Sequence, residues 1–140
     1  MNRFLTTTLT VMLASCSYLT AADEHGHGKA VELGKVTIGS ATVNVEVAGT
    51  IAAGKEVHVE LHVSPPTPAP KAIRVWIGVE NGRGSEKAKA EGEAAHPGGY
   101  EAHVDVPSPL PEGSKLWISV EPAEGEAAKS SLPLPAASTK

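Results

Sequence analysis

Two histidines near the start of the chain stand in a pattern that can bind a transition metal. They are His25 and His27, within Asp23-Glu24-His25-Gly26-His27-Gly28. If an export signal is cleaved after Ala22, Asp23 carries a free amine and His25 becomes the third residue. The amine, two backbone amides and the imidazole then offer four nitrogens in one plane, which is the arrangement that Cu(II) and Ni(II) favour. The alternative is a flexible polar linker that contains two histidines.

A second set of possible ligands lies on the polar sides of two predicted strands. Side chains two positions apart share one face of a strand. The first strand presents Glu56, His58, Glu60 and His62, and the second presents Glu101, His103 and Asp105. If the strands are neighbours, His58, His62 and His103 are candidate metal ligands, although successive positions on one face lie ~7 Å apart. The alternative is an ordinary solvated sheet face, and we expect His96, in a glycine-rich loop, simply to be exposed.

The two tryptophans form a third candidate surface. Trp76 and Trp117 lie out of phase with the apolar positions of their predicted strands, so both should point away from the core. Neighbouring strands would bring them together as an exposed aromatic patch, which usually binds a partner or a ligand. The alternatives are that the phase is wrong for one strand, since Trp is mostly buried, or that the chain termini cover the rings.

Composition and motifs exclude several classes of function. The formal net charge is −4, so we do not expect a nucleic-acid partner. The sequence has no Gly-x-Ser-x-Gly, no phosphate-binding loop and no His-Glu-x-x-His motif, so we expect no enzyme. Cys16 is the single cysteine, which leaves no disulfide within the folded part of one chain.

The first 22 residues have the features of an export signal. Arg3 precedes an apolar run at 4–14 that is too short for a permanent membrane helix. Two cleavage sites compete: Leu13-Ala14-Ser15-Cys16 resembles a bacterial lipobox, in which Cys16 would be lipidated, and Thr20-Ala21-Ala22 suits an ordinary signal peptidase. We therefore expect a periplasmic or secreted protein, or alternatively a lipoprotein that contacts the membrane only through its lipid anchor.

Alternation of apolar and polar residues dominates the rest of the chain and predicts strands. The clearest cover 43–47, 57–63, 73–79, 100–106 and 116–120, with weaker ones at 31–38 and 129–134. A hairpin turn is expected at 49–54 and a proline-rich crossover between sheets at 64–70. The segment 87–94 is predicted as a short edge strand or, alternatively, a short helix.

About seven such strands favour an all-β fold, an immunoglobulin-like antiparallel β-sandwich, with a small open β-barrel as the alternative. The predicted organisation is a signal at 1–22, a flexible histidine-containing head at 23–30, the sandwich at 31–134 and a disordered tail at 135–140.

The run Gly98-Gly99-Tyr100-Glu101-Ala102-His103-Val104-Asp105-Val106-Pro107 resembles a late strand of YtkA-like and FixH-like periplasmic domains. The hairpin at 43–63, with Gly54-Lys55 at its turn, fits the same layout. These families are small exported immunoglobulin-like modules, often associated with metal handling or respiratory assembly. The head is also similar to the histidine-rich starts of periplasmic heavy-metal efflux components. The resemblance implies the fold and the compartment, and no binding residue is transferred from it.

The function expected from these features is binding or buffering of a divalent metal, preferably Cu(II), by an exported protein that is not an enzyme. Asp23, Glu24, His25 and His27 supply the first site, and His58, His62 and His103 the second. The alternative is a structural or interaction module that docks an envelope or efflux protein through Trp76 and Trp117. A third possibility is a carbohydrate accessory domain that uses the same tryptophans.

Overall fold

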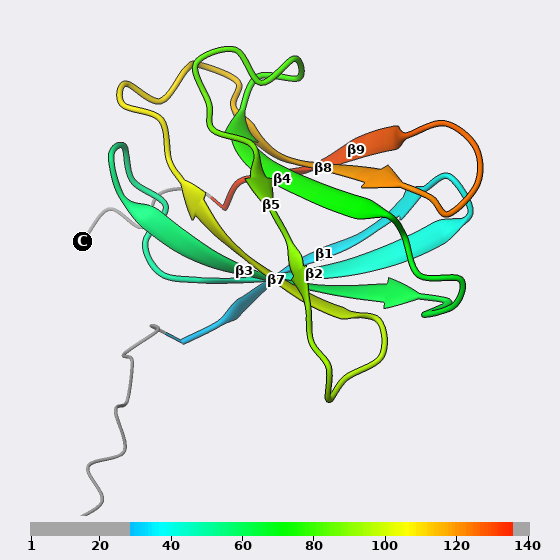
Figure 1. Cartoon of the computed structure of the whole chain (residues 1–140). Helices are drawn as coiled ribbons and strands as arrows, with labels where there is room; N and C mark the ends of the chain where they lie inside the picture. Colours follow the sequence, from blue (N-terminus) through cyan, green and yellow to red (C-terminus); the bar gives the residue numbers. More distant parts are fainter. Residues whose placement is uncertain (1–28, 136–140) are drawn as a thin grey trace, which may run out of the picture.

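The computed structural model describes residues 29–135, which form two packed antiparallel sheets (Figure 1). The first sheet has the order β1-β2-β3-β7-β6. Its strands are β1 (Val31–Ile38), β2 (Ala41–Ala48), β3 (Glu56–Ser64), β7 (Gly99–Asp105) and β6 (Glu91–Gly92). The second sheet has the order β5-β4-β8-β9. Its strands are β5 (Ala88–Lys89), β4 (Ala72–Gly78), β8 (Lys115–Glu121) and β9 (Ala128–Pro133).

This strand order confirms the predicted sandwich. Strands β2, β3, β7 and β6 take the A-B-E-D positions of the immunoglobulin fold, and β4, β8 and β9 take the C-F-G positions. Seven strands are six to nine residues long, and β5 and β6 have two residues each. The alternative of a barrel is wrong, since the strands form two separate sheets.

The segment 87–94 passes from one sheet to the other. Lys89 of β5 pairs with Arg74 of β4, whereas Glu91 of β6 pairs with Glu101 of β7. Between them Ala90 is buried and donates its backbone N–H to the carbonyl of Ile73 at 2.9 Å. The segment is therefore extended, as one prediction held, and the helical alternative is wrong. The edge-strand prediction is confirmed, since β5 lies at the edge of the second sheet and β6 at the edge of the first.

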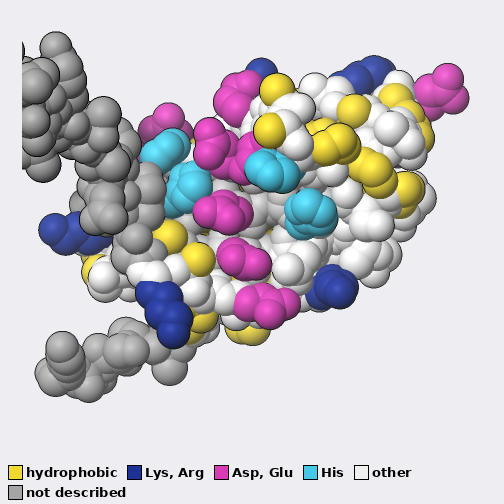
Figure 2. Space-filling view, turned by 90° about the horizontal axis from the view of Figure 1, so that it is seen from below, with side chains coloured by type: hydrophobic (Ala, Val, Ile, Leu, Met, Phe, Trp, Pro, Cys, Tyr) yellow, Lys and Arg dark blue, Asp and Glu magenta, His cyan; other side chains and the backbone are white. Residues whose placement is uncertain are grey.

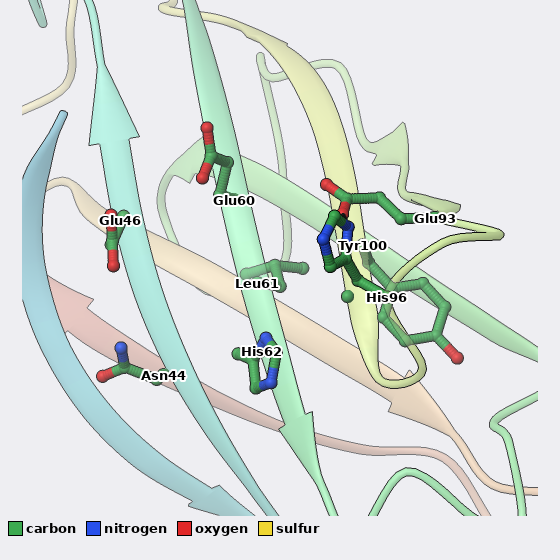
Figure 3. Close-up of a pocket in the computed structure, with 9 residues that line it drawn as sticks. Asn44, Glu46, Glu60, Leu61, His62, Glu93, His96 and Tyr100 are labelled. Atoms are coloured by element: carbon green, nitrogen blue, oxygen red, sulfur yellow. Dashed lines mark hydrogen bonds and ion pairs between the residues drawn. The ribbon is translucent and has the colours of Figure 1, made fainter. Parts of the chain in front are cut away.

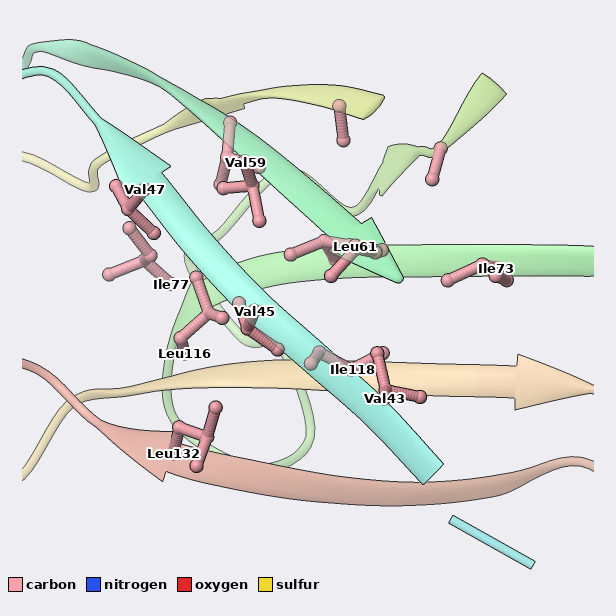
Figure 4. Packing of buried hydrophobic residues seen from close by; sticks show 14 of the residues in the cluster. Val43, Val45, Val47, Val59, Leu61, Ile73, Ile77, Leu116, Ile118 and Leu132 are labelled. Atoms are coloured by element: carbon pink, nitrogen blue, oxygen red, sulfur yellow. The ribbon is translucent and has the colours of Figure 1, made fainter. Parts of the chain in front are cut away.

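The core lies between the sheets and consists of the inward-facing alternate positions of the long strands (Figure 4). Val43 and Val45 of β2 and Leu61 of β3 face Ile73 of β4 and Ile118 of β8, and each is at most 2% exposed. No polar or charged residue within 29–135 is buried. The apolar periodicity thus fixes which face of each strand turns inward, and polar groups remain on the two outer faces.

Two loops set the relative placement of the strands. In the hairpin between β2 and β3, the Lys55 N–H donates to the carbonyl of Ala52 at 3.0 Å, and the Gly54 N–H donates to the carbonyl of Val106, just after β7, at 2.9 Å. The proline-rich segment after Ser64 carries the chain from β3 in the first sheet to β4 in the second. Both features agree with the sequence-based expectations. Residues 29–135 contain no helix that is long and apolar enough to cross a membrane.

Candidate functional site

Pairing of β3 with β7 brings two of the predicted ligands together. His58 lies directly opposite His103, and the centroids of the two imidazole rings are 5.1 Å apart. The His58 side chain is 11% exposed, whereas that of His103 is 56% exposed. The predicted adjacency of these strands is therefore confirmed. The two imidazoles form the centre of what we call the histidine pair, His58 and His103.

Carboxylates surround the histidine pair. Nε2 of His58 lies 3.3 Å from Oε2 of Glu101, and its Nδ1 lies 3.6 Å from Oε1 of Glu60. Nδ1 of His103 lies 3.1 Å from Oε1 of Glu56. Protonated ring nitrogens can donate to these oxygens, and a cation can replace those protons because imidazole nitrogen and carboxylate oxygen are both good metal ligands. The pair is therefore set among groups that favour positive charge.

A row of glutamates crosses the same face of the sheet. Each member is directly opposite the next on the neighbouring strand. In order, the row consists of Glu32, Glu46, Glu60, Glu101 and Glu91. Acidic and histidine side chains together cover much of this outer face (Figure 2). Glu32, Glu46 and Glu91 are not among the predicted site residues, because strand periodicity predicts a face but gives no cross-strand register.

His62, the third predicted ligand on this face, is separated from the histidine pair. It lies four residues beyond His58 on β3, about 13 Å along the strand, and pairs with Asn44 and Gly99. The structure therefore does not bring His58, His62 and His103 into one cluster. His62 belongs instead to a groove of about 220 Å³ (Figure 3).

The groove at His62 is bounded by the turn that precedes β7. Gly99, opposite His62, has no side chain, and a Cβ there would lie 3.0 Å from Oε2 of Glu93. Glu93 and His96 occupy that space, with Nδ1 of His96 2.9 Å from the Glu93 carboxylate. His96 is exposed, as expected, but it has a partner that the sequence did not reveal. The groove also contains Asn44, whose buried Oδ1 has no hydrogen-bond partner within the described chain.

Neither the histidine pair nor the groove at His62 forms a complete metal site within the described residues. Within residues 29–135, no set of three or more His, Cys, Asp or Glu side chains is arranged to hold a metal ion. The other predicted ligands, Asp23, Glu24, His25 and His27, lie outside the described residues, as does Cys16. A metal ion on this face therefore needs at least one ligand besides those the described residues bring together.

The tryptophans are neighbours, but the predicted exposed patch is wrong for Trp76. Trp76 pairs with Trp117 across β4 and β8, and the two rings stack with centroids 6.2 Å apart. Trp76 is only 2% exposed, and Trp117 is partly buried. Trp76 does point to the outer face, as its phase predicts, since it lies outside the core cluster. The prediction was wrong about exposure, because other residues cover the Trp76 ring.

The cover over Trp76 comes from the loop after β4. The Lys87 ammonium lies 4.7 Å from the centre of a Trp76 ring, a cation–π contact. The indole N–H groups of Trp76 and Trp117 donate to the carbonyls of Val79 at 2.9 Å and Gly78 at 3.1 Å. The chain termini, proposed as an alternative cover, lie outside the described residues. The stacked rings present little free aromatic surface for a partner or a sugar.

Comparisons with known proteins found no match for this chain. No family model matches the chain, and neither does any curated protein or solved structure. The resemblance to YtkA-like and FixH-like domains stays a prediction from the residues quoted above.

Proposed function

We propose that this is an exported protein, not an enzyme, which binds or buffers a divalent transition metal, with Cu(II) preferred. It would act in the periplasm or outside the cell, or as a lipoprotein if Cys16 is acylated. The observation that carries the proposal is the histidine pair, two imidazoles 5.1 Å apart among three carboxylates. Cu(II) binds nitrogen donors most strongly among first-row divalent ions, so two adjacent imidazoles favour it.

The missing ligand can come from the head. Val31, the first residue of β1, pairs with Val47, which pairs with Val59, the neighbour of His58. Strands β1 and β3 are two strand spacings apart, about 10 Å. The four residues from His27 to Val31 span at most about 13 Å when extended. The head therefore has the length to bring an imidazole onto an ion at the histidine pair.

Titration of Cu(II) into the exported protein tests this function. We expect one equivalent to give a visible d–d absorption and nitrogen hyperfine structure in electron paramagnetic resonance. His58→Asn and His103→Asn should each weaken binding by about tenfold or more, because even groups behind the ligands contribute 10–100-fold. His25→Ala should weaken it too. His62→Asn is the matched control, since it removes an imidazole from the same face about 13 Å away.

The results distinguish a metal site on the sheet face from one confined to the head. Unchanged binding by both pair variants, with loss in His25→Ala, would confine the metal to the head and exclude the sheet face. Absence of any stoichiometric Cu(II) binding would overturn the function. The intact mass of the same preparation shows whether Asp23 or an acylated Cys16 leads the chain, and only the first provides the amine that the head motif needs.

The alternative of docking through the tryptophans has less support. Trp76 is buried and its ring faces Trp117 and Lys87. Only the partly exposed Trp117 could take part directly.

A further inference from the structure

The outer face of the second sheet has a row of its own, of the opposite charge. Lys89 lies opposite Arg74, Arg74 opposite Ser119, and Ser119 opposite Lys129. Three cations thus lie in one cross-strand row, with a hydroxyl between two of them. Like charges directly opposite one another are unfavourable unless other groups compensate them.

Not every cation in this row has a carboxylate partner. Nζ of Lys89 lies 3.3 Å from Oε1 of Glu91, and Nζ of Lys129 lies 3.3 Å from Oε1 of Glu80. Arg74 is exposed and has no carboxylate within 4 Å anywhere in residues 29–135. Its guanidinium is the one member of the row without an opposite charge in the described chain.

A groove of about 340 Å³ opens beside Arg74. Its lining consists of Arg74, Trp76, Lys87, Ser119 and Lys129, together with Ala127 and Ala128. No acidic side chain belongs to this lining. The Lys87 ammonium lies over the ring of Trp76, another residue of the lining.

We propose that this groove binds an oxyanion, the phosphate or carboxylate group of a small ligand. The Arg74 guanidinium offers paired N–H donors that match two oxygens of such a group. The Ser119 hydroxyl lies between Arg74 and Lys129 in the row and offers a further donor. Lys87 and Lys129 belong to the same lining and add positive charge, part of which Glu80 offsets at Lys129. The site does not depend on metal binding, because it lies on the other sheet.

Tryptophan fluorescence gives a local readout of this site. The chain has two tryptophans, Trp76 and Trp117, which stack on one another on this face. Inorganic phosphate, acetate and citrate are titrated separately into the purified exported protein at constant ionic strength, with chloride as the exchanged ion. We expect a saturable change in emission with at least one oxyanion. Saturation by phosphate alone identifies a phosphate site, and saturation by acetate or citrate alone identifies a carboxylate site.

Variants show whether the groove is responsible. Arg74→Gln should weaken the affinity at least tenfold, which is about 1.4 kcal/mol, and Arg74→Lys should fall between, since it keeps the charge and loses the paired donors. Lys35→Gln removes an exposed cation from β1 in the other sheet and should change nothing. Circular dichroism checks each fold, and Lys129→Gln replaces Arg74→Gln if the latter fails to fold.

The proposal fails if no oxyanion gives a saturable response, or if chloride reproduces it. It also fails if the folded Arg74→Gln or Lys129→Gln variant binds as tightly as the original protein.

Discussion

At the scale of single residues, the glutamate row is an unfavourable arrangement of like charges. Glu46 lies between Glu32 and Glu60 in the cross-strand register, and no cation within 29–135 lies within ion-pair distance of it. Like charges directly opposite one another destabilise a sheet. The row therefore lowers the stability of the folded chain, and a bound cation on this face would reduce that cost.

Neutralising one member should stabilise the protein. We expect Glu46→Gln to raise the free energy of unfolding by about 0.2–1 kcal/mol at neutral pH and low salt, since it removes two cross-strand repulsions. The gain should shrink as salt is added, because exposed charges are screened. Urea unfolding at two salt concentrations measures both effects.

Glu126→Gln is the control, because Glu126 is an exposed carboxylate in the loop between β8 and β9, outside the row. An equal gain in this control would show that net charge, rather than the row, is responsible.

At the scale of elements, the end of β4 shows why a loop determines the surroundings of Trp76. Gly78 has φ +144°, and a Cβ there would overlap Oγ of Ser85. That hydroxyl donates to the carbonyl of Ile77 at 2.6 Å and holds the loop against the strand. The same loop ends beside Lys87, whose ammonium lies over the Trp76 ring. Gly78 is thus the position where strand and loop meet.

Gly78→Ala should therefore cost more than an ordinary glycine replacement. The strained backbone conformation alone costs about 1–3 kcal/mol for an L-residue, and overpacking against Ser85 adds about 1–3 kcal/mol. Thermal or urea unfolding measures the sum. Gly34→Ala is the matched control, since Gly34 has φ +131° and an added Cβ there would make only an ordinary contact, 3.7 Å from Cδ2 of Leu132. Equal losses in the two variants would mean that the contact with Ser85 is unimportant.

Strands β3 and β4 show how far the sequence could predict the candidate site. Alternation in β3 and β4 correctly gave the outward direction of His58, His62 and Trp76, because strand periodicity fixes faces. It could not give the cover over Trp76, which depends on the path of a loop. Nor could it show whether His58 or His62 lies opposite His103, since the cross-strand register decides which side chains meet.

At the scale of the whole molecule, one short segment ties the two sheets together. β5 belongs to the second sheet, β6 to the first, and the buried Ala90 connects them. On the opposite side β1 and β9 are in contact. The sheets share one core between these two connections. The fold class was predictable because the apolar faces of many alternating strands must be buried against one another. The change of sheet within 87–94 was not predictable, because only short, polar segments pair there.

The two sheets should therefore unfold together. We expect the denaturation curve from tryptophan fluorescence, which reports on the second sheet, to coincide with that from far-UV circular dichroism, which reports on all strands. Separate midpoints would show that one sheet can lose its structure while the other remains.

The charges of the two outer faces have a consequence that the net charge of −4 conceals. The glutamate row lies on the outer face of the first sheet and the row of Lys89, Arg74 and Lys129 on that of the second, so the two rows should generate potentials of opposite sign on the two sides of the sandwich. An approaching ion or charged surface experiences attraction or repulsion according to the side it meets. Near a charged surface the protein should turn so that the row of opposite charge faces that surface.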